Sequence, residues 1–191
     1  MKRAVLISIG PKWCALISSG EKTLELRKTF PQAETPFTCY VYETQGKTDM
    51  PWMDEDGHMI FHGRGAVVLE FVCDGAERFD VPFPAYMDQT DTRLLKAACI
   101  RYEEAHAYLG HRSGYGWHIS QLKVYDKPRQ LTDFRQYNTE CLRHGPDGVP
   151  MCEKGIQCQM CRVKRPPQSW MYVELGGQND NRRTGVMQEG A

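Results

Sequence analysis

The chain has 191 residues, of which 41% are hydrophobic and 25% are charged, as in an ordinary soluble globular protein. This length predicts one domain whose core needs no disulfides. The 24 basic residues balance the 24 acidic ones, so the whole-chain charge indicates no particular partner. No apolar run approaches the roughly 20 residues that span a bilayer, and the first ten residues lack the apolar stretch of a secretory signal. We therefore expect a cytoplasmic protein without membrane contact.

The N-terminal third predicts two strands separated by a short helix. Residues 5–9 are apolar and β-branched, which is typical of a strand. Pro11 suits the first position of a helix, and Gly20 suits its C-terminal end. Residues 23–28 then alternate, so that Leu24 and Leu26 face one way while the polar residues face the other.

The rest of the chain predicts further short strands and two more helices. Strands are expected over residues 37–43, 65–73, 78–83, 114–125 and 170–175, and helices after Asp91 and over 103–109. The apolar parity of 114–125 switches near Ser120 and Gln121, which indicates a β-bulge. A long polar connection spans 45–63, and the polar residues 176–191 are expected to form a disordered tail. This pattern favours an α+β fold with a curled or closed, mostly antiparallel sheet.

The segment Gly20-Glu-Lys-Thr-Leu-Glu-Leu-Arg27 resembles the signature of ASCH domains, which is Gly-x-Lys-Thr-x-x-x-Arg between a helix and a strand. The resemblance covers residues 4–175 and implies a single PUA-like domain over 1–175, built as a mostly antiparallel β-barrel with short flanking helices. A cysteine-rich loop insertion over 138–168, followed by Arg165-Pro-Pro-Gln-Ser-Trp170, also resembles a subgroup that phages and mobile elements often carry.

The resemblance further implies a cleft between the barrel and the first helix, bordered by Lys22, Glu25 and Arg27, that binds RNA or a nucleotide. Residues 1–30 contain six basic and two acidic residues, which suits a phosphate-bearing ligand or, equally, a solvated basic face. In such a cleft the two cations would hold phosphate while Glu25 accepts hydrogen bonds from a base or sugar. The alternative is a surface ion pair between Glu25 and Arg27, which would contribute little.

Three more residues are candidates for contact with the same ligand. Lys12 belongs to the basic N-terminal segment. Glu70 interrupts an apolar strand, so its carboxylate must be paired, exposed or functional. Trp117 either stacks on a base or belongs to the core.

Two other functions remain open from the sequence. One branch of the family resembles an amidohydrolase that removes the acetyl group of N4-acetylcytidine with a Lys, a Thr and a Glu. Lys22 matches the Lys, whereas Glu25 occupies the Thr position and the Glu has no clear counterpart. The other alternative is a phage or mobile-element accessory protein that binds a host protein through residues 45–63 or the cysteine-rich loop.

The cysteine-rich segment predicts a structural zinc. Cys158 and Cys161 have the spacing of a zinc half-site, and the remaining ligands would be Cys152 with either Cys141 or His144. A loop rich in Gly and Pro has little else to order it, so metal binding would supply the folding energy. The alternative is free thiols. Four other cysteines lie on apolar faces and are expected to be small core residues: Cys14, Cys39, Cys73 and Cys99.

Overall fold

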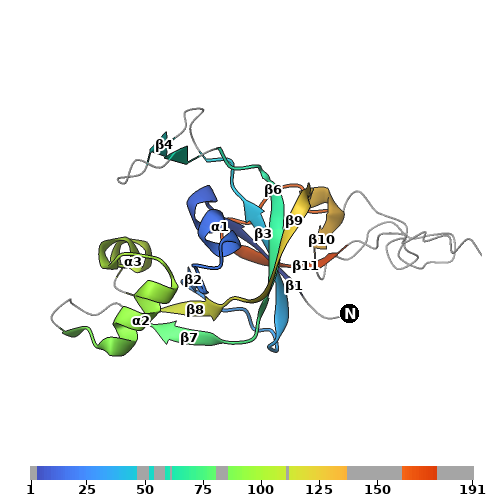
Figure 1. Ribbon diagram of the computed structural model, residues 1–191. Helices are drawn as coiled ribbons and strands as arrows, with labels where there is room; N and C mark the ends of the chain where they lie inside the picture. The colour runs from blue at the N-terminus through green and yellow to red at the C-terminus, as the bar shows by residue number, and fades with distance from the viewer. Residues whose placement is uncertain are drawn as a thin grey trace, which may run out of the picture.

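The computed structural model describes residues 4–46, 52–53, 59–60, 62–80, 86–110, 112–136 and 161–175. These residues form an α+β fold with a six-stranded mixed sheet, a three-stranded antiparallel sheet and short helices (Figure 1). A small hairpin pairs β4 (Trp52–Met53) with β5 (Met59–Ile60) inside the long polar connection. The predicted α+β class is therefore confirmed.

The larger sheet brings the two ends of the described chain together. Its strand order is β10-β11-β1-β3-β6-β9, and among these described strands only β1 and β3 pair in parallel. A parallel pair needs a crossover connection, which the first helix and β2 supply here. The strands are β1 (Ala4–Ile9), β3 (Phe37–Glu43), β6 (Ala66–Cys73), β9 (Ser120–Arg129), β10 (Phe134–Gln136) and β11 (Trp170–Leu175).

The smaller sheet pairs β2 (Leu24–Arg27), β8 (Gly114–His118) and β7 (Ala76–Phe79). After Ile119 the chain leaves β8 and enters β9, so the strand predicted over 114–125 crosses from one sheet to the other. The parity switch lies at this crossing. A register shift of the β6–β9 pair confirms the predicted irregularity, as does the positive φ of 46° at Gln121.

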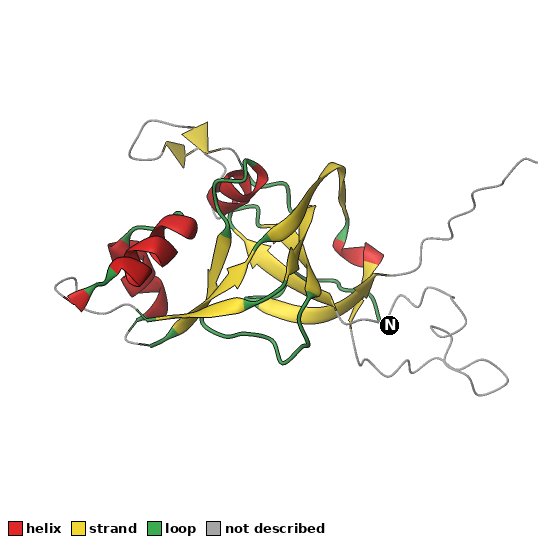
Figure 2. Cartoon of the chain, turned by 60° about the horizontal axis from the view of Figure 1, so that its bottom comes forward, coloured by secondary structure: helices red, strands yellow, loops and turns green. Residues whose placement is uncertain are grey.

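The helical elements bounded within the described residues are α1 (Pro11–Ser18), α2 (Gln89–Ala97), α3 (Tyr102–Leu109) and the 3₁₀ turn η2 (Leu131–Asp133). Pro11 opens α1 as predicted. The N-cap of α2 is Asp88, not Asp91 as the sequence predicts, because Asp91 occupies the third helical position and completes a capping box. Figures 1 and 2 show α2 and α3 gathered where β7 and β8 extend from the larger sheet.

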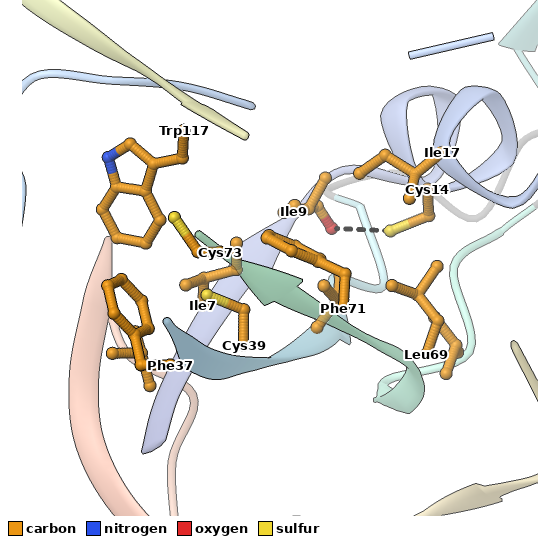
Figure 3. Packing of buried hydrophobic residues seen from close by; sticks show 13 residues of the cluster. Ile7, Ile9, Cys14, Ile17, Phe37, Cys39, Leu69, Phe71, Cys73 and Trp117 are labelled. Atoms are coloured by element: carbon orange, nitrogen blue, oxygen red, sulfur yellow. Dashed lines mark hydrogen bonds between the residues drawn. The ribbon is translucent and has the colours of Figure 1, made fainter. Parts of the chain in front are cut away.

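Apolar side chains form a core between the two sheets and beneath α1 (Figure 3). Trp117 and Phe71 are fully buried there, and burial of side chains of this size contributes about 1.5–3 kcal/mol each. A second cluster covers the opposite face of the larger sheet, and a third packs Leu24 and Leu26 against α2 and α3. The alternation predicted for β2 is thereby confirmed.

Cys14, Cys39 and Cys73 are buried with free thiols, as predicted for small core residues. Burial raises the pKa of Cys73 to about 11 and raises the pKa values of Cys14 and Cys39 as well. Their thiols therefore stay protonated at neutral pH. Cys99 is only partly buried, because it lies in the turn after α2 with a φ of 51°.

Among the described strands, the hydrogen-bonded ladders do not close into the barrel that the sequence predicts. No ladder joins β2 to β1 in this part of the chain. The Arg27 guanidinium makes that link instead, because Nη2 donates to the carbonyl of Ser8 at 2.7 Å. The Arg27 side chain thus links β2 to β1, which no backbone ladder joins among the described strands.

The last part of the predicted cysteine-rich insertion belongs to the domain core. Val163 N donates to Phe134 O, and Gln136 N donates to Cys161 O, each at 2.9 Å. Val163 and Cys161 are buried.

Residues 137–160 and 176–191 lie outside the described residues, so the prediction of a disordered tail stays a prediction. Within the described ranges, no helix has the length and apolar character needed to cross a membrane.

Candidate functional site

A cavity of about 250 Å³ lies where β2, the end of β1, α1 and α3 meet. It lies beside the first helix, as the sequence predicts for the cleft. The residues that line it are Ser8, Ile9, Gly10, Trp13, Lys22, Glu25, Leu26, Arg27, Ile100, Glu104 and Tyr108.

The alternation of β2 places Glu25 and Arg27 on the strand face opposite Leu24. Both faces are covered, because the helices cover one and the larger sheet lies against the other. Glu25 and Arg27 are each only 6% exposed, and Lys22 is 3% exposed. The Glu25–Arg27 ion pair is therefore buried and is not the surface pair that the sequence offers as an alternative.

These three residues form a Lys22–Glu25–Arg27 triad in which the carboxylate bridges two cations. Lys22 Nζ lies 3.4 Å from Glu25 Oε2, and Arg27 Nε lies 3.0 Å from Oε1. The Nε–H of Arg27 is not aligned for a hydrogen bond, so the Arg27 guanidinium and the Glu25 carboxylate attract each other through their opposite charges. Buried charges persist when they are paired in this way.

Backbone carbonyls hold both cations in place. Arg27 Nη2 donates to Ser8 O at 2.7 Å, and Nη1 donates to Ser169 O at 3.4 Å. Lys22 Nζ donates to Ala98 O at 2.7 Å. Ala98 caps the C-terminus of α2, where a cation satisfies an unpaired carbonyl and complements the helix dipole. The triad therefore ties β2 to β1 and to α2.

Aromatic side chains flank the triad on two sides. The ring of Trp13 lies 5.1 Å from Lys22 Nζ, within the range of a cation–π contact. Tyr108 of α3 also lines the cavity, and burial raises the pKa of its phenol. Tyr108 also keeps 37% of its surface exposed, so it is accessible to a ligand.

A second ion pair connects α1 with α3 beside the cavity. Lys12 Nζ lies 3.5 Å from Glu104 Oε1. Partial burial raises the pKa of the Glu104 carboxyl, but the hydrogen bond from the Arg101 backbone N–H and the charge of Lys12 outweigh it. The pKa of Glu104 therefore lies below its usual value, and the carboxylate is ionised at neutral pH.

Of the six residues predicted for ligand contact, the structure brings Lys22, Glu25 and Arg27 together in one cavity. Lys12 pairs with a cavity residue but does not line the cavity. The other two, Glu70 and Trp117, lie elsewhere.

Glu70 bonds to the Tyr125 hydroxyl and lies 3.6 Å from Lys123 Nζ, among residues of β6 and β9. Trp117 is fully buried, and its Nε1–H donates to Thr29 O at 3.2 Å. Trp117 therefore belongs to the core, which was one of the two roles that the sequence left open for it. Neither residue is among those that line the cavity.

Sequence reasoning missed the contributions of α3 and of the turn before it. Glu104 and Tyr108 are spaced four residues apart, so one helix face presents both, but nothing local connects them with β2. Ile100 carries no chemical signal of its own. These residues join the site through packing between segments that are far apart in the chain.

The zinc site stays a prediction, because four of its five candidate ligands lie outside the described residues: Cys141, His144, Cys152 and Cys158. Cys161 is described and buried. Within the described ranges, no three His, Cys, Asp or Glu residues are grouped so that they could hold a metal ion.

The fold is ASCH-like. It is similar to the crystal structure of ASCH from Zymomonas mobilis, with a TM-score of 0.54 and 16% identity over 90% of this chain and 87% of that chain. A serine-to-alanine mutant of the Z. mobilis protein gives a TM-score of 0.54 and 88% coverage of that chain. A tyrosine-to-phenylalanine mutant gives a TM-score of 0.52 and 90% coverage. Both mutants are 15% identical to this chain.

A scan against protein-family models and a search of curated proteins find no match. At such identities the similarity to the solved structures is one of fold. The resemblance seen in the sequence is thus confirmed at the level of an ASCH-like architecture, whereas the comparisons give no support for the phage-associated subgroup.

Proposed function

We propose that the cavity binds one nucleotide unit of RNA, with a modified ribonucleotide included in that class. The observation that supports this proposal most is the buried Lys22–Glu25–Arg27 triad in the wall of a cavity of about 250 Å³. Buried polar groups held by a second set of contacts are typical of a preorganised binding site.

The size of the cavity favours a small, flat ligand. Pockets for drug-sized molecules measure about 300–1,000 Å³, and this cavity falls just below that range. A nucleobase fits such a space better than two stacked nucleotides do. The proposal is therefore that one base enters the cavity while the rest of the nucleotide stays at its mouth.

The chemistry of the lining suits recognition of a base edge. Glu25 and Glu104 are acceptors for exocyclic amino groups, and an arginine is a donor to ring nitrogens and carbonyl oxygens. Trp13 and Tyr108 provide aromatic surface, and single-stranded RNA is commonly recognised by such stacking together with hydrogen bonds to the base edges. The ASCH-like fold adds support, because the resemblance in the sequence implies RNA or nucleotide binding.

Calorimetric titration with the four ribonucleoside monophosphates and with N4-acetylcytidine tests the proposal. We expect saturable binding of at least one of them, weakened at least tenfold in Tyr108→Ala, which removes an aromatic surface contributing about 1–3 kcal/mol. Lys123→Ala is the control, because Lys123 is exposed on β9 and does not line the cavity. Equal affinity in Tyr108→Ala and in the unmodified protein would contradict the proposal.

The same titration separates binding from catalysis. Hydrolysis of N4-acetylcytidine would give cytidine and acetate, and chromatography of the mixture detects both. If the unmodified protein hydrolyses N4-acetylcytidine and Lys22→Met does not, the protein is an amidohydrolase and the binding function proposed above is replaced. Binding without turnover supports the proposal as stated.

A further inference from the structure

The cations of the cavity are already neutralised by the protein. Its lining contains two cationic side chains, Lys22 and Arg27, and two carboxylates, Glu25 and Glu104, so its formal charge is zero. Each cation also donates to a backbone carbonyl, through Lys22 Nζ and Arg27 Nη2. A phosphate inside the cavity would face both carboxylates at close range, which is unfavourable. The phosphate of a bound nucleotide must therefore lie elsewhere.

A basic and aromatic surface adjoins the cavity at the end of β2. Lys28 follows Arg27 in the chain and is exposed, and its Nζ lies 5.1 Å from the centre of the Tyr108 ring. Tyr115 of β8 is 37% exposed, and its ring centre lies 6.1 Å from that of Phe30. We call Lys28, Tyr108 and Tyr115 the flanking surface.

The flanking surface is continuous with the cavity through Tyr108 and Arg27. Tyr108 lines the cavity and is also the ring beneath Lys28. Tyr115 pairs with Arg27 across β2 and β8, and side chains paired in this way share one face of the sheet. A cation beside an exposed aromatic ring, with a second exposed ring close along the same strand pair, is a combination that binds single-stranded nucleic acid, since phosphates contact the cation and bases stack on the rings.

We infer that the protein binds an RNA strand rather than a free nucleotide: one base occupies the cavity, and the adjacent phosphate and base lie on the flanking surface. This inference depends on the proposed function of the cavity. Lys28 contacts the phosphate that the neutral cavity excludes, and Tyr115 stacks with the neighbouring base. The strand therefore follows the end of β2 toward β8.

Fluorescence anisotropy with short, labelled ribo-oligonucleotides, compared with titration of the monophosphate of the same base, tests the inference. Tyr115→Ala should weaken oligonucleotide binding about five- to a hundredfold, and Tyr115→Phe, which keeps the ring, should restore it. Lys28→Ala should reduce the slope of log K against log salt by about 0.7, the value for one phosphate contact in a single strand. Tyr115 does not line the cavity, and a monophosphate has no neighbouring base, so Tyr115→Ala should leave monophosphate affinity unchanged.

Tyr86→Ala and Lys123→Ala are the matched controls, because Tyr86 is a 77% exposed tyrosine, Lys123 is an exposed lysine that pairs with Glu70, and neither lines the cavity. Both should leave oligonucleotide affinity unchanged. If the monophosphate binds while Tyr115→Ala and Lys28→Ala leave oligonucleotide binding intact, the inference fails and the proposed function stands. If neither ligand binds, both fail.

Discussion

Glu25 is the residue on which the site depends most, because it neutralises two buried cations at once. Removing one partner of a buried pair leaves an uncompensated charge and costs about 3–5 kcal/mol. We therefore expect Glu25→Gln, which keeps the shape but not the charge, to lower the free energy of unfolding by about 3–5 kcal/mol. Urea denaturation followed by circular dichroism measures this change.

Asp80→Asn is the control for that experiment. Asp80 pairs with Arg78 on the surface, where both side chains are more than half exposed. Exposed pairs contribute about 0–1 kcal/mol, so this variant should retain nearly all of its stability. A Glu25→Gln variant as stable as Asp80→Asn would show that the triad is solvated in solution.

At this scale the sequence predicted the members of the triad but not their burial. The alternation of residues 23–28 puts Glu25 and Arg27 on one face, because side chains alternate along any strand. Their burial depends on α3 and on Ser169, which lies more than 140 residues further along the chain. A local sequence pattern cannot predict such a contact, and it cannot predict that Tyr108 and Glu104 lie beside β2.

At the scale of elements, β8 positions both β2 and α3. A Cβ atom at Gly114, the first residue of β8, would lie 2.9 Å from Arg27 O and 2.6 Å from Leu109 Cδ2. The backbone oxygen cannot yield as a side chain can, so Gly114→Ala should push β8 away from β2. We expect a loss of about 1–3 kcal/mol in the free energy of unfolding, as for other overpacked sites, measured by urea denaturation.

Gly116→Ala, on the same strand, is the matched control. A Cβ atom there would lie 3.4 Å from Leu24 Cδ1, which is ordinary contact. The substitution also restricts the unfolded chain, which stabilises by about 0.4–1 kcal/mol where the backbone permits it. Equal losses of stability in the two variants would contradict the close approach of β8 to Arg27.

Most elements could be predicted from the sequence because their signals are local. Residues 37–43 are rich in aromatic and β-branched side chains and form β3 with the predicted bounds. Pro11 and Gly20 correctly delimit α1. The three-residue strand β10 was missed because it is too short to show a period, and the N-cap of α2 was misassigned because Asp88 and Asp91 are both good caps.

On the scale of the whole molecule, the sequence predicted the class of fold but not the closure of its sheet. The order of strands and helices predicts the α+β class, and the resemblance of residues 20–27 to the ASCH signature implies the ASCH-like architecture that the solved structures support. Whether a barrel closes depends on pairing between distant strands, which alternation along the chain does not specify. In the described part of the molecule Arg27 links β2 to β1 across the two sheets, and the cavity lies beside this contact.

Amide chemical shifts in nuclear magnetic resonance can show directly whether a bound ribonucleotide occupies the cavity. We predict that the largest shifts occur in three places, at Trp13, over residues 22–27 and over residues 104–108, which line the cavity on α1, β2 and α3. The amides of β9 around Lys123 should stay unchanged. Shifts centred on β9, or no shifts at saturating ligand, would contradict the claim that this cavity is the nucleotide site.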